Sequence, residues 1–142
     1  MKISDVMTRD VATVDANQTA REAANFMLEG DAGSIPVTDG ETLIGMITDR
    51  DIAVRGVALG LGPDTPVREL MTDGLICARV DDSIQDVADK MSEAQVRRLP
   101  VIDEDENLVG IVSLGDLSRE TEGEEAHEAL EGVSQPGAQH AQ

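Results

Sequence analysis

The chain has 142 residues and a formal net charge of −18, from 29 acidic and 11 basic residues. This length suffices for one compact domain, or for two small modules that stabilise each other. The negative charge, with one Phe and no Trp or Tyr, leaves few of the cations and stacking surfaces that nucleic acid requires, and it also disfavours anionic membrane surfaces.

The N-terminal stretch "MKISDVMTRD" contains no apolar run of signal-peptide length, and no run in the chain approaches the ~18 residues that span a bilayer. Cys77 is the single cysteine, so the chain forms no internal disulfide. The sequence therefore predicts a cytoplasmic protein, in which Cys77 is a buried small residue rather than a redox switch.

The elements of the first half are predicted in the order strand, helix, strand, turn, strand, helix. The β-branched runs "VATV", "SIPV" and "LIGMIT" indicate the strands, and "VTDGETLIG" indicates a hairpin between the last two. The helix between the first two strands has an apolar face at the i, i+3, i+4, i+7 spacing. This face consists of Ala20, Ala23, Ala24 and Met27.

The second half repeats the first after 64 or 65 residues. "ISDVM", "IPV" and "LIGMITDRDIA" return as "VRELM", "LPV" and "LVGIVSLGDLS", and Ile84, Val87, Ala88 and Met91 form the matching helix face. The strands are "ICARV", "RLPVI" and "LVGIVS". We expect an α/β (α+β) fold of two β-α-β-β-α repeats, over 1–62 and 63–119, joined by the Gly- and Pro-rich "GVALGLGPDTPVREL".

Residues 120–142 are acidic and poor in large apolar side chains. This composition predicts a disordered tail, or a short frayed helix around residues 124–130.

Thr48 and Asp51 are spaced three apart at the start of a predicted helix, and Ser113 and Asp116 repeat them. Ser/Thr-x-x-acid is the capping box, so each pair has a purely structural interpretation. Two further helix starts, at Thr19 and Ser83, have the same form.

A binding interpretation of the two pairs stays open beside the capping one. Each pair follows directly on a strand that carries a glycine, Gly45 or Gly110, three residues before the hydroxyl. A missing side chain allows close approach of backbone or ligand, and a helix that begins at the carboxyl end of a strand favours anions. The carboxylates are able to accept hydrogen bonds from a ribose diol.

The doubled pattern "IPV…LIGMITDRDIA" and "RRLPVIDEDENLVGIVSLGDLS", with "VMT" or "LMT" before each copy, resembles a tandem pair of cystathionine-β-synthase (CBS) domains over residues 3–119. The resemblance implies two pseudo-symmetric repeats packed sheet to sheet, a homodimer formed through helical faces, and adenosine ligands such as AMP, ADP, ATP, NAD or S-adenosylmethionine in clefts between the repeats. It assigns ribose hydroxyls to Asp51 and Asp116, and ribose or phosphate to Thr48 and Ser113. It places adenine between the strands around Ile35, Pro36, Leu99 and Pro100.

The basic pair Arg97 and Arg98 matches a phosphate-binding feature of the family, whereas the first repeat has Gly33 and Ser34 there. Guanidinium groups suit bidentate phosphate contacts, so the hypothesis is one strong phosphate site and a second, weaker or empty one.

Catalysis is not expected, because His127 and His140 both lie in the tail and no metal-ligand spacing occurs. The sequence thus predicts a regulatory sensor of adenosine ligands that needs no cofactor and acts on an unidentified partner protein. The alternative is a ligand-independent dimerisation or interaction module.

Overall fold

The computed structural model describes residues 1–120, and the chain divides into two compact units. The central unit is residues 12–75. The terminal unit combines residues 1–11 with the chain from residue 76 onward. The predicted tail lies outside the described residues from position 121.

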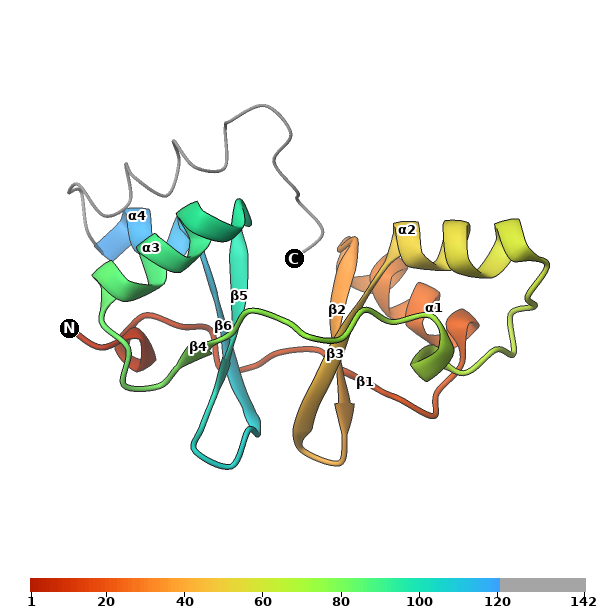
Figure 1. The fold of residues 1–142 in the computed structure, drawn as a ribbon, viewed down its shortest axis with the longest axis horizontal. Coiled ribbons are helices and arrows are strands. Elements are labelled where there is room, and N and C mark those ends of the chain that lie inside the picture. The colour runs from red at the N-terminus through yellow and green to blue at the C-terminus, as the bar shows by residue number, and fades with distance from the viewer. Residues whose placement is uncertain (121–142) are drawn as a thin grey trace. The chain divides into compact units, whose positions relative to one another are not determined.

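The central unit is a three-stranded sheet with helices, shown in orange to yellow in Figure 1. Strand β1 pairs in parallel with β2, and β2 pairs antiparallel with β3. Helix α2 continues into a π-helical turn over 52–56 and a 3-10 turn over 57–59. The elements are β1 (Val14–Asp15), α1 (Ala20–Gly30), β2 (Ser34–Asp39), β3 (Thr42–Thr48) and α2 (Asp49–Asp51).

The terminal unit repeats this topology with strand order β4-β5-β6. Strand β4 is parallel to β5, and β5 is antiparallel to β6. The elements are β4 (Ala78–Arg79), α3 (Ile84–Ala94), β5 (Arg98–Ile102), β6 (Leu108–Ser113) and α4 (Leu114–Glu120). The predicted α+β fold with two similar repeats is confirmed.

Helices α1 and α3 begin where their sequences predict. Thr19 and Ser83 cap the N-termini through their hydroxyl oxygens, which satisfies one free N–H in each first turn. Both helices end at a residue in the left-handed conformation, Asp31 with φ 48° and Gln95 with φ 59°.

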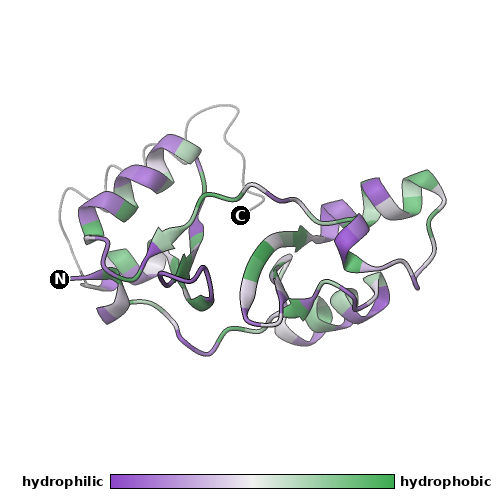
Figure 2. Cartoon of the chain, turned by 60° about the horizontal axis from the view of Figure 1, so that its bottom comes forward, coloured by the Kyte–Doolittle hydropathy of each residue, from purple (hydrophilic) through white to green (hydrophobic). Residues whose placement is uncertain are grey.

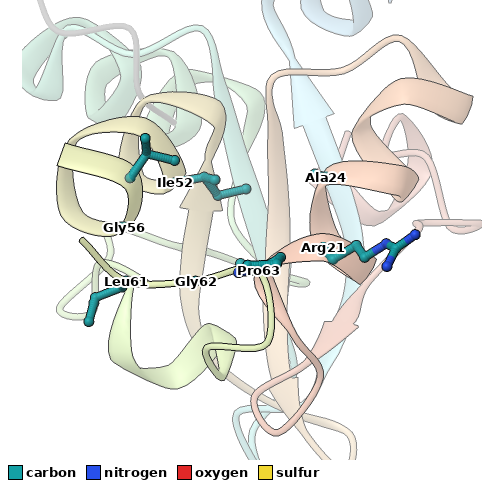
Figure 3. A pocket seen from close by; sticks show the side chains of 9 residues that line it. Arg21, Ala24, Ile52, Gly56, Leu61, Gly62 and Pro63 are labelled. Carbon is teal, nitrogen blue, oxygen red and sulfur yellow. The ribbon is translucent and has the colours of Figure 1, made fainter. Parts of the chain in front are cut away.

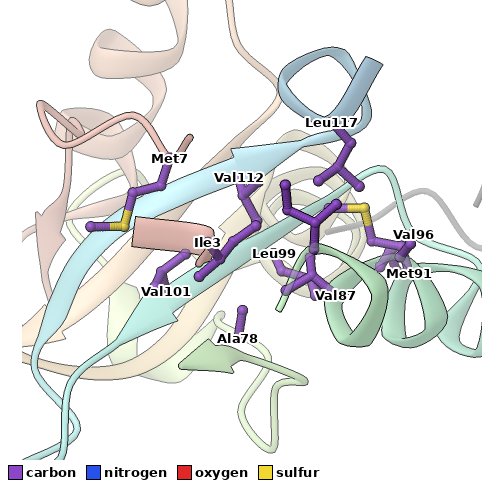
Figure 4. Close-up of a cluster of buried hydrophobic side chains, with 12 residues drawn as sticks. Ile3, Met7, Ala78, Val87, Met91, Val96, Leu99, Val101, Val112 and Leu117 are labelled. Carbon is purple, nitrogen blue, oxygen red and sulfur yellow. The ribbon is translucent and has the colours of Figure 1, made fainter. Parts of the chain in front are cut away.

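Each unit has its own apolar core between the helices and the sheet. Figure 4 shows the terminal core, where Val87 and Met91 of α3 lie against Leu99, Val101 and Val112 of the sheet. The helix ribbons in Figure 2 alternate between hydrophobic and hydrophilic colours, as expected for helices with one buried face.

The face predicted for α3 is fully buried, but the face predicted for α1 is only partly so. Ala20, Ala23 and Met27 are buried, whereas Ala24 is exposed and Phe26 packs partly against the core instead. The "VATV" run is also shorter as a strand than predicted, because only Val14 and the next residue pair with β2.

The first segment of each sequence repeat packs into a core made mainly by the other repeat. We call Ile3–Thr8 and Val67–Thr72 the leading segments. Ile3 is fully buried in the terminal core, and Val67 and Leu70 are fully buried in the central core. The compact units therefore divide the chain near residues 11 and 75, whereas the repeats were expected to divide it at residue 62.

Candidate functional site

Each leading segment is hydrogen-bonded to the last strand of its unit. The amide of Thr72 donates to the Met46 carbonyl over 2.8 Å, and the amide of Met46 donates back over 2.9 Å. Thr8 and Ile111 exchange the same two bonds over 2.8 and 2.9 Å. Each leading segment thus ends beside the strand that carries the candidate hydroxyl.

Gly45 and Gly110 are needed for this approach. A Cβ on Gly45 would lie 2.7 Å from the Thr72 carbonyl oxygen, and one on Gly110 would lie 2.8 Å from that of Thr8. The sequence left open whether these glycines allow the close approach of backbone or of a ligand. In the structure, the backbone of the leading segment is what approaches them.

Thr48 and Asp51 form reciprocal hydrogen bonds where β3 meets α2. The amide of Asp51 donates to Thr48 Oγ1 and the amide of Thr48 donates to Asp51 Oδ2, both over 3.0 Å. Ser113 and Asp116 form the same pair of bonds after β6, over 2.9 and 3.2 Å. The capping interpretation is confirmed for both pairs.

The second carboxylate oxygen of each aspartate faces an arginine farther along the chain. Asp51 Oδ1 lies 3.9 Å from Arg55 Nε, and Asp116 Oδ1 is paired with Arg119. The side chain of Asp116 is 6 % exposed, whereas that of Arg119 is 70 % exposed. An exposed arginine can turn into solvent, so a ligand hydroxyl can replace it on the buried carboxylate.

The caps of α1 and α3 are simpler. Thr19 Oγ1 accepts the Glu22 amide over 3.2 Å, and Ser83 Oγ accepts the Asp86 amide over 3.1 Å. Glu22 does not return a bond to its cap but accepts one from Gln18 Nε2 over 2.6 Å. These two hydroxyls are therefore caps that serve as controls for the site pairs.

Arg97 and Arg98 lie next to the Ser113–Asp116 pair. Arg98 is directly opposite Ser113 in the β5–β6 ladder, and the Arg97 carbonyl accepts the Leu114 amide over 3.0 Å. Neither guanidinium forms an ion pair within residues 1–120. The structure thus brings four of the predicted residues together in the terminal unit.

The same backbone geometry occurs in the central unit with different side chains. Ser34 is opposite Thr48, and the Gly33 carbonyl accepts the Asp49 amide over 2.9 Å. The side chain of Asp49 extends over Gly33, since its Oδ2 lies 3.2 Å from where a Cβ would be. Sequence reasoning missed Asp49, although aligning "TDRD" with "SLGD" would have shown an acid in one repeat and an apolar Leu114 in the other.

The four strand residues predicted to enclose adenine are all buried in the isolated chain. Ile35 and Leu99 belong to the two apolar cores. Pro36 and Pro100 follow them in the strands, so they lie on the opposite face of each sheet. Of the four residues predicted to enclose adenine, Pro36 and Pro100 thus face away from the cores, whereas Ile35 and Leu99 face into them.

An apolar pocket of about 290 Å³ lies on the helical side of the central unit. Ala20 and Ala24 of α1, Ile52 after α2, and Leu61 and Pro63 of the crossover are among the residues that line it (Figure 3). The pocket does not include Thr48 or Asp51. It is a separate feature from the hydroxyl–carboxylate pairs.

Two further findings concern the described residues only. No three His, Cys, Asp or Glu side chains in residues 1–120 are grouped so that they could hold a metal ion. None of the helices in this part of the chain is both long and apolar enough to cross a membrane.

Cys77, which the sequence predicted to be buried, is only partly buried. This burial raises the pKa of the Cys77 thiol, with a smaller contribution from Glu106 and against the effect of the nearby Lys90 and Arg79.

The comparisons with known proteins agree with this geometry. A family model described as "CBS domain" matches residues 3–56 and 67–123. The CBS domain-containing protein YhcV of Bacillus subtilis is 45 % identical over 133 residues, which cover 93 % of this chain and 94 % of the relative.

Solved structures superpose on the chain over most of its length. Hypoxic Response Protein I, with two coordinated zinc ions, has a TM-score of 0.76 and 40 % identity, covering 85 % of this chain and 99 % of that one. CBSX2 in complex with AMP has a TM-score of 0.73 and 26 % identity, covering 84 % of this chain and 94 % of that one. The CBS domain pair of MJ0100, in complex with 5′-methylthioadenosine and S-adenosyl-L-methionine, has a TM-score of 0.69 and 31 % identity. The match covers 84 % of this chain and 94 % of that one.

Proposed function

The chain belongs to the CBS domain family, and from this premise we propose that it is a regulatory module that binds adenosine-containing ligands and passes their occupancy to a partner protein. In each unit, the ligand binds where the last strand, the leading segment and the hydroxyl–carboxylate pair meet. The bound AMP, 5′-methylthioadenosine and S-adenosyl-L-methionine in similar CBS proteins support this ligand class.

The observation that carries the proposal is the buried carboxylate of Asp116 at the strand end that also holds Arg97 and Arg98, whose guanidinium groups form no ion pair within residues 1–120. Asp116 has one oxygen in the cap, and within residues 1–120 its second oxygen is held by the exposed Arg119 alone. The hydroxyls of a ribose diol can donate hydrogen bonds to this second oxygen, and Arg97 and Arg98 can then bind a phosphate on the same ligand. Asp51 provides the corresponding oxygen in the central unit.

The second candidate is a ligand-independent interaction module. It is favoured by the reciprocal cap bonds, which account for both hydroxyls and both carboxylates without a ligand. It is also favoured by large apolar side chains on the helical side of the central unit, where Leu28, Val57 and Leu59 are 80, 71 and 72 % exposed.

Isothermal titration calorimetry with AMP, ADP, ATP, NAD and S-adenosylmethionine separates the two candidates, once any co-purified ligand has been removed. We expect saturable binding by the wild-type chain. Asp51→Ala and Asp116→Ala should each remove the binding of one unit, because each loses a carboxylate that a ribose diol needs.

Ser83→Ala is the matched control, because it removes a helix cap of the same kind away from the proposed site. We expect this variant to lose about 1 kcal/mol of stability and to keep its ligand affinity. Absence of binding in the wild type, or binding that survives both aspartate substitutions, would favour the interaction module instead.

We further propose that the protein acts as a cytoplasmic homodimer. The exposed apolar side chains of the central unit support association, because a second copy would remove them from water. Ligand binding stabilises the bound arrangement by about 2.7 kcal/mol at 100 times Kd, which suffices to bias an interface between two states.

A further inference from the structure

The two candidate sites differ in charge at equivalent backbone positions. Positions 33 and 97 are equivalent because each carbonyl accepts the amide of the first residue after the hydroxyl, Asp49 or Leu114. Positions 34 and 98 are equivalent because each lies opposite the hydroxyl residue in its ladder. The central unit therefore has Gly, Ser and Asp where the terminal unit has Arg, Arg and Leu.

The terminal unit presents positive charge beside its ribose-binding carboxylate. Arg97 is exposed and Arg98 is partly buried, and neither is neutralised by a carboxylate within residues 1–120. Leu114 adds no charge. Arg98 stands opposite Ser113, which is hydrogen-bonded to Asp116, so a ribose held at Asp116 would lie at the same strand end as Arg98.

The central unit presents negative charge at the corresponding place. The carboxylate of Asp49 occupies the space above Gly33, and its Oδ1 accepts only a backbone amide, that of Arg50, over 2.8 Å. The nearby Arg55 is engaged elsewhere, since it faces Asp51 and donates to the Met71 carbonyl over 3.1 Å. Arg50 is exposed and forms no ion pair with Asp49 within residues 1–120, so a phosphate placed here would approach a carboxylate that no salt bridge neutralises.

We propose that the two units select adenosine ligands by charge, an inference that rests on the proposed function. The terminal unit takes a phosphorylated adenosine ligand, and the central unit takes an adenosine derivative without phosphate whose 5′ substituent is neutral or positively charged. Asp49 is the specificity-determining residue of the central unit, because it excludes the phosphate that Arg97 and Arg98 attract. The central site is thus a second site of different specificity rather than a weakened copy.

The test compares two probes that differ at the 5′ position, AMP and 5′-methylthioadenosine, by calorimetry on the full chain. AMP binding should be lost in Asp116→Ala and kept in Asp51→Ala. Binding of 5′-methylthioadenosine should be lost in Asp51→Ala. A thermal unfolding scan of each variant verifies that it is folded.

A charge exchange tests the role of Asp49 directly. The triple variant Gly33→Arg/Ser34→Arg/Asp49→Leu gives the central unit the terminal pattern, and the three changes belong together because a side chain at position 33 needs the space that Asp49 occupies. We expect this variant to gain a second AMP site and the affinity of its central unit for AMP to rise by about ten-fold or more, as new charge-assisted hydrogen bonds replace a repulsion.

The outcomes distinguish this inference from the proposed function. Equal AMP binding by both units of the wild type would overturn charge selection while adenosine binding stands. A folded triple variant with unchanged AMP stoichiometry and affinity would also overturn it. If neither probe nor any other adenosine ligand binds the wild type, the proposed function fails and this inference fails with it.

Discussion

At Gly110 the packing of the terminal unit depends on a missing side chain. A Cβ there would lie 2.6 Å from Met7 Sδ and 2.8 Å from the carbonyl oxygen of Thr8. The methionine is flexible and can move, but the backbone of Thr8 is fixed by two hydrogen bonds with Ile111, one through its amide and one through its carbonyl. A side chain at position 110 must therefore push the leading segment away from β6.

Gly110→Ala is accordingly expected to destabilise the protein by about 1–3 kcal/mol, the usual cost of overpacking. Urea denaturation measures this loss. Gly30→Ala is the control, since nothing lies within 4 Å of a Cβ at the end of α1. Equal stability of the two variants would show that the leading segment can shift without cost.

Helix α3 is attached to the segment before it by one lysine. Lys90 Nζ donates to Asp82 Oδ2 over 2.9 Å and to the Cys77 carbonyl over 3.0 Å. Burial by itself would raise the pKa of Asp82, but the hydrogen bonds from Lys90 and from the Arg79 amide, with the charges of both residues, outweigh it and lower the pKa below its ordinary value of 3.8.

The lowered pKa predicts a pH dependence of stability. Unfolding returns Asp82 to its ordinary pKa, so its contribution is complete above 3.8 and is lost as the pH falls through the lower, folded value. The difference in unfolding free energy between wild type and Asp82→Asn should therefore shrink as the pH falls below about 4. Urea titrations across this range measure it.

Asp81→Asn is the control for this prediction, because Asp81 pairs with Lys2 at the surface with a side chain that is 71 % exposed. Exposed pairs of this kind contribute little, so the control should follow the wild type more closely. A stability difference for Asp82→Asn that stays constant with pH would contradict the assigned interaction.

The whole chain is organised by exchange of its leading segments. The central core contains Val67 and Leu70, which belong by sequence to the second repeat. The terminal core contains Ile3 and Met7, which belong to the first. A unit cut at the repeat boundary loses buried side chains and a hydrogen-bonded edge.

Two fragments test this organisation. Residues 12–75 should unfold cooperatively on heating, monitored by circular dichroism, whereas residues 1–62 should not, because they lack the leading segment that closes the central core. In the fragment of residues 12–75, the substitution Val67→Asp should abolish the unfolding transition, because it buries an unpaired charge. Indistinguishable melting of 12–75 and 1–62 would refute the assignment.

The proposed homodimer makes a prediction at the same scale. Leu59→Glu places a charge on the exposed apolar side of the central unit, so light scattering should report half of the wild-type mass. Glu41→Lys, an exposed charge change in the β2–β3 turn, is the control and should keep the wild-type mass. A monomeric wild type would contradict the proposal.

Local patterns in the sequence predicted much of the fold and part of the site. The apolar face of α3 and the caps at Thr19, Ser83, Thr48 and Ser113 depend on residues within one or two turns, so spacing alone predicts them. The exposed Ala24 shows the limit of this reasoning. Periodicity predicts which residues share a helix face, but not how much of that face the rest of the unit covers.

The tertiary structure decided which segment packs on which unit and what the glycines are for. Ile3 packs in the terminal core with residues that lie more than 70 positions later in the chain. This packing is favoured by the free energy of burying apolar surface, which no local periodicity reports. The same holds for Asp49, whose position above Gly33 follows from the pairing of β2 with β3. The sequence by itself determined the elements and the residue types at the two sites, and only the packing of distant segments decided which of these residues lie side by side.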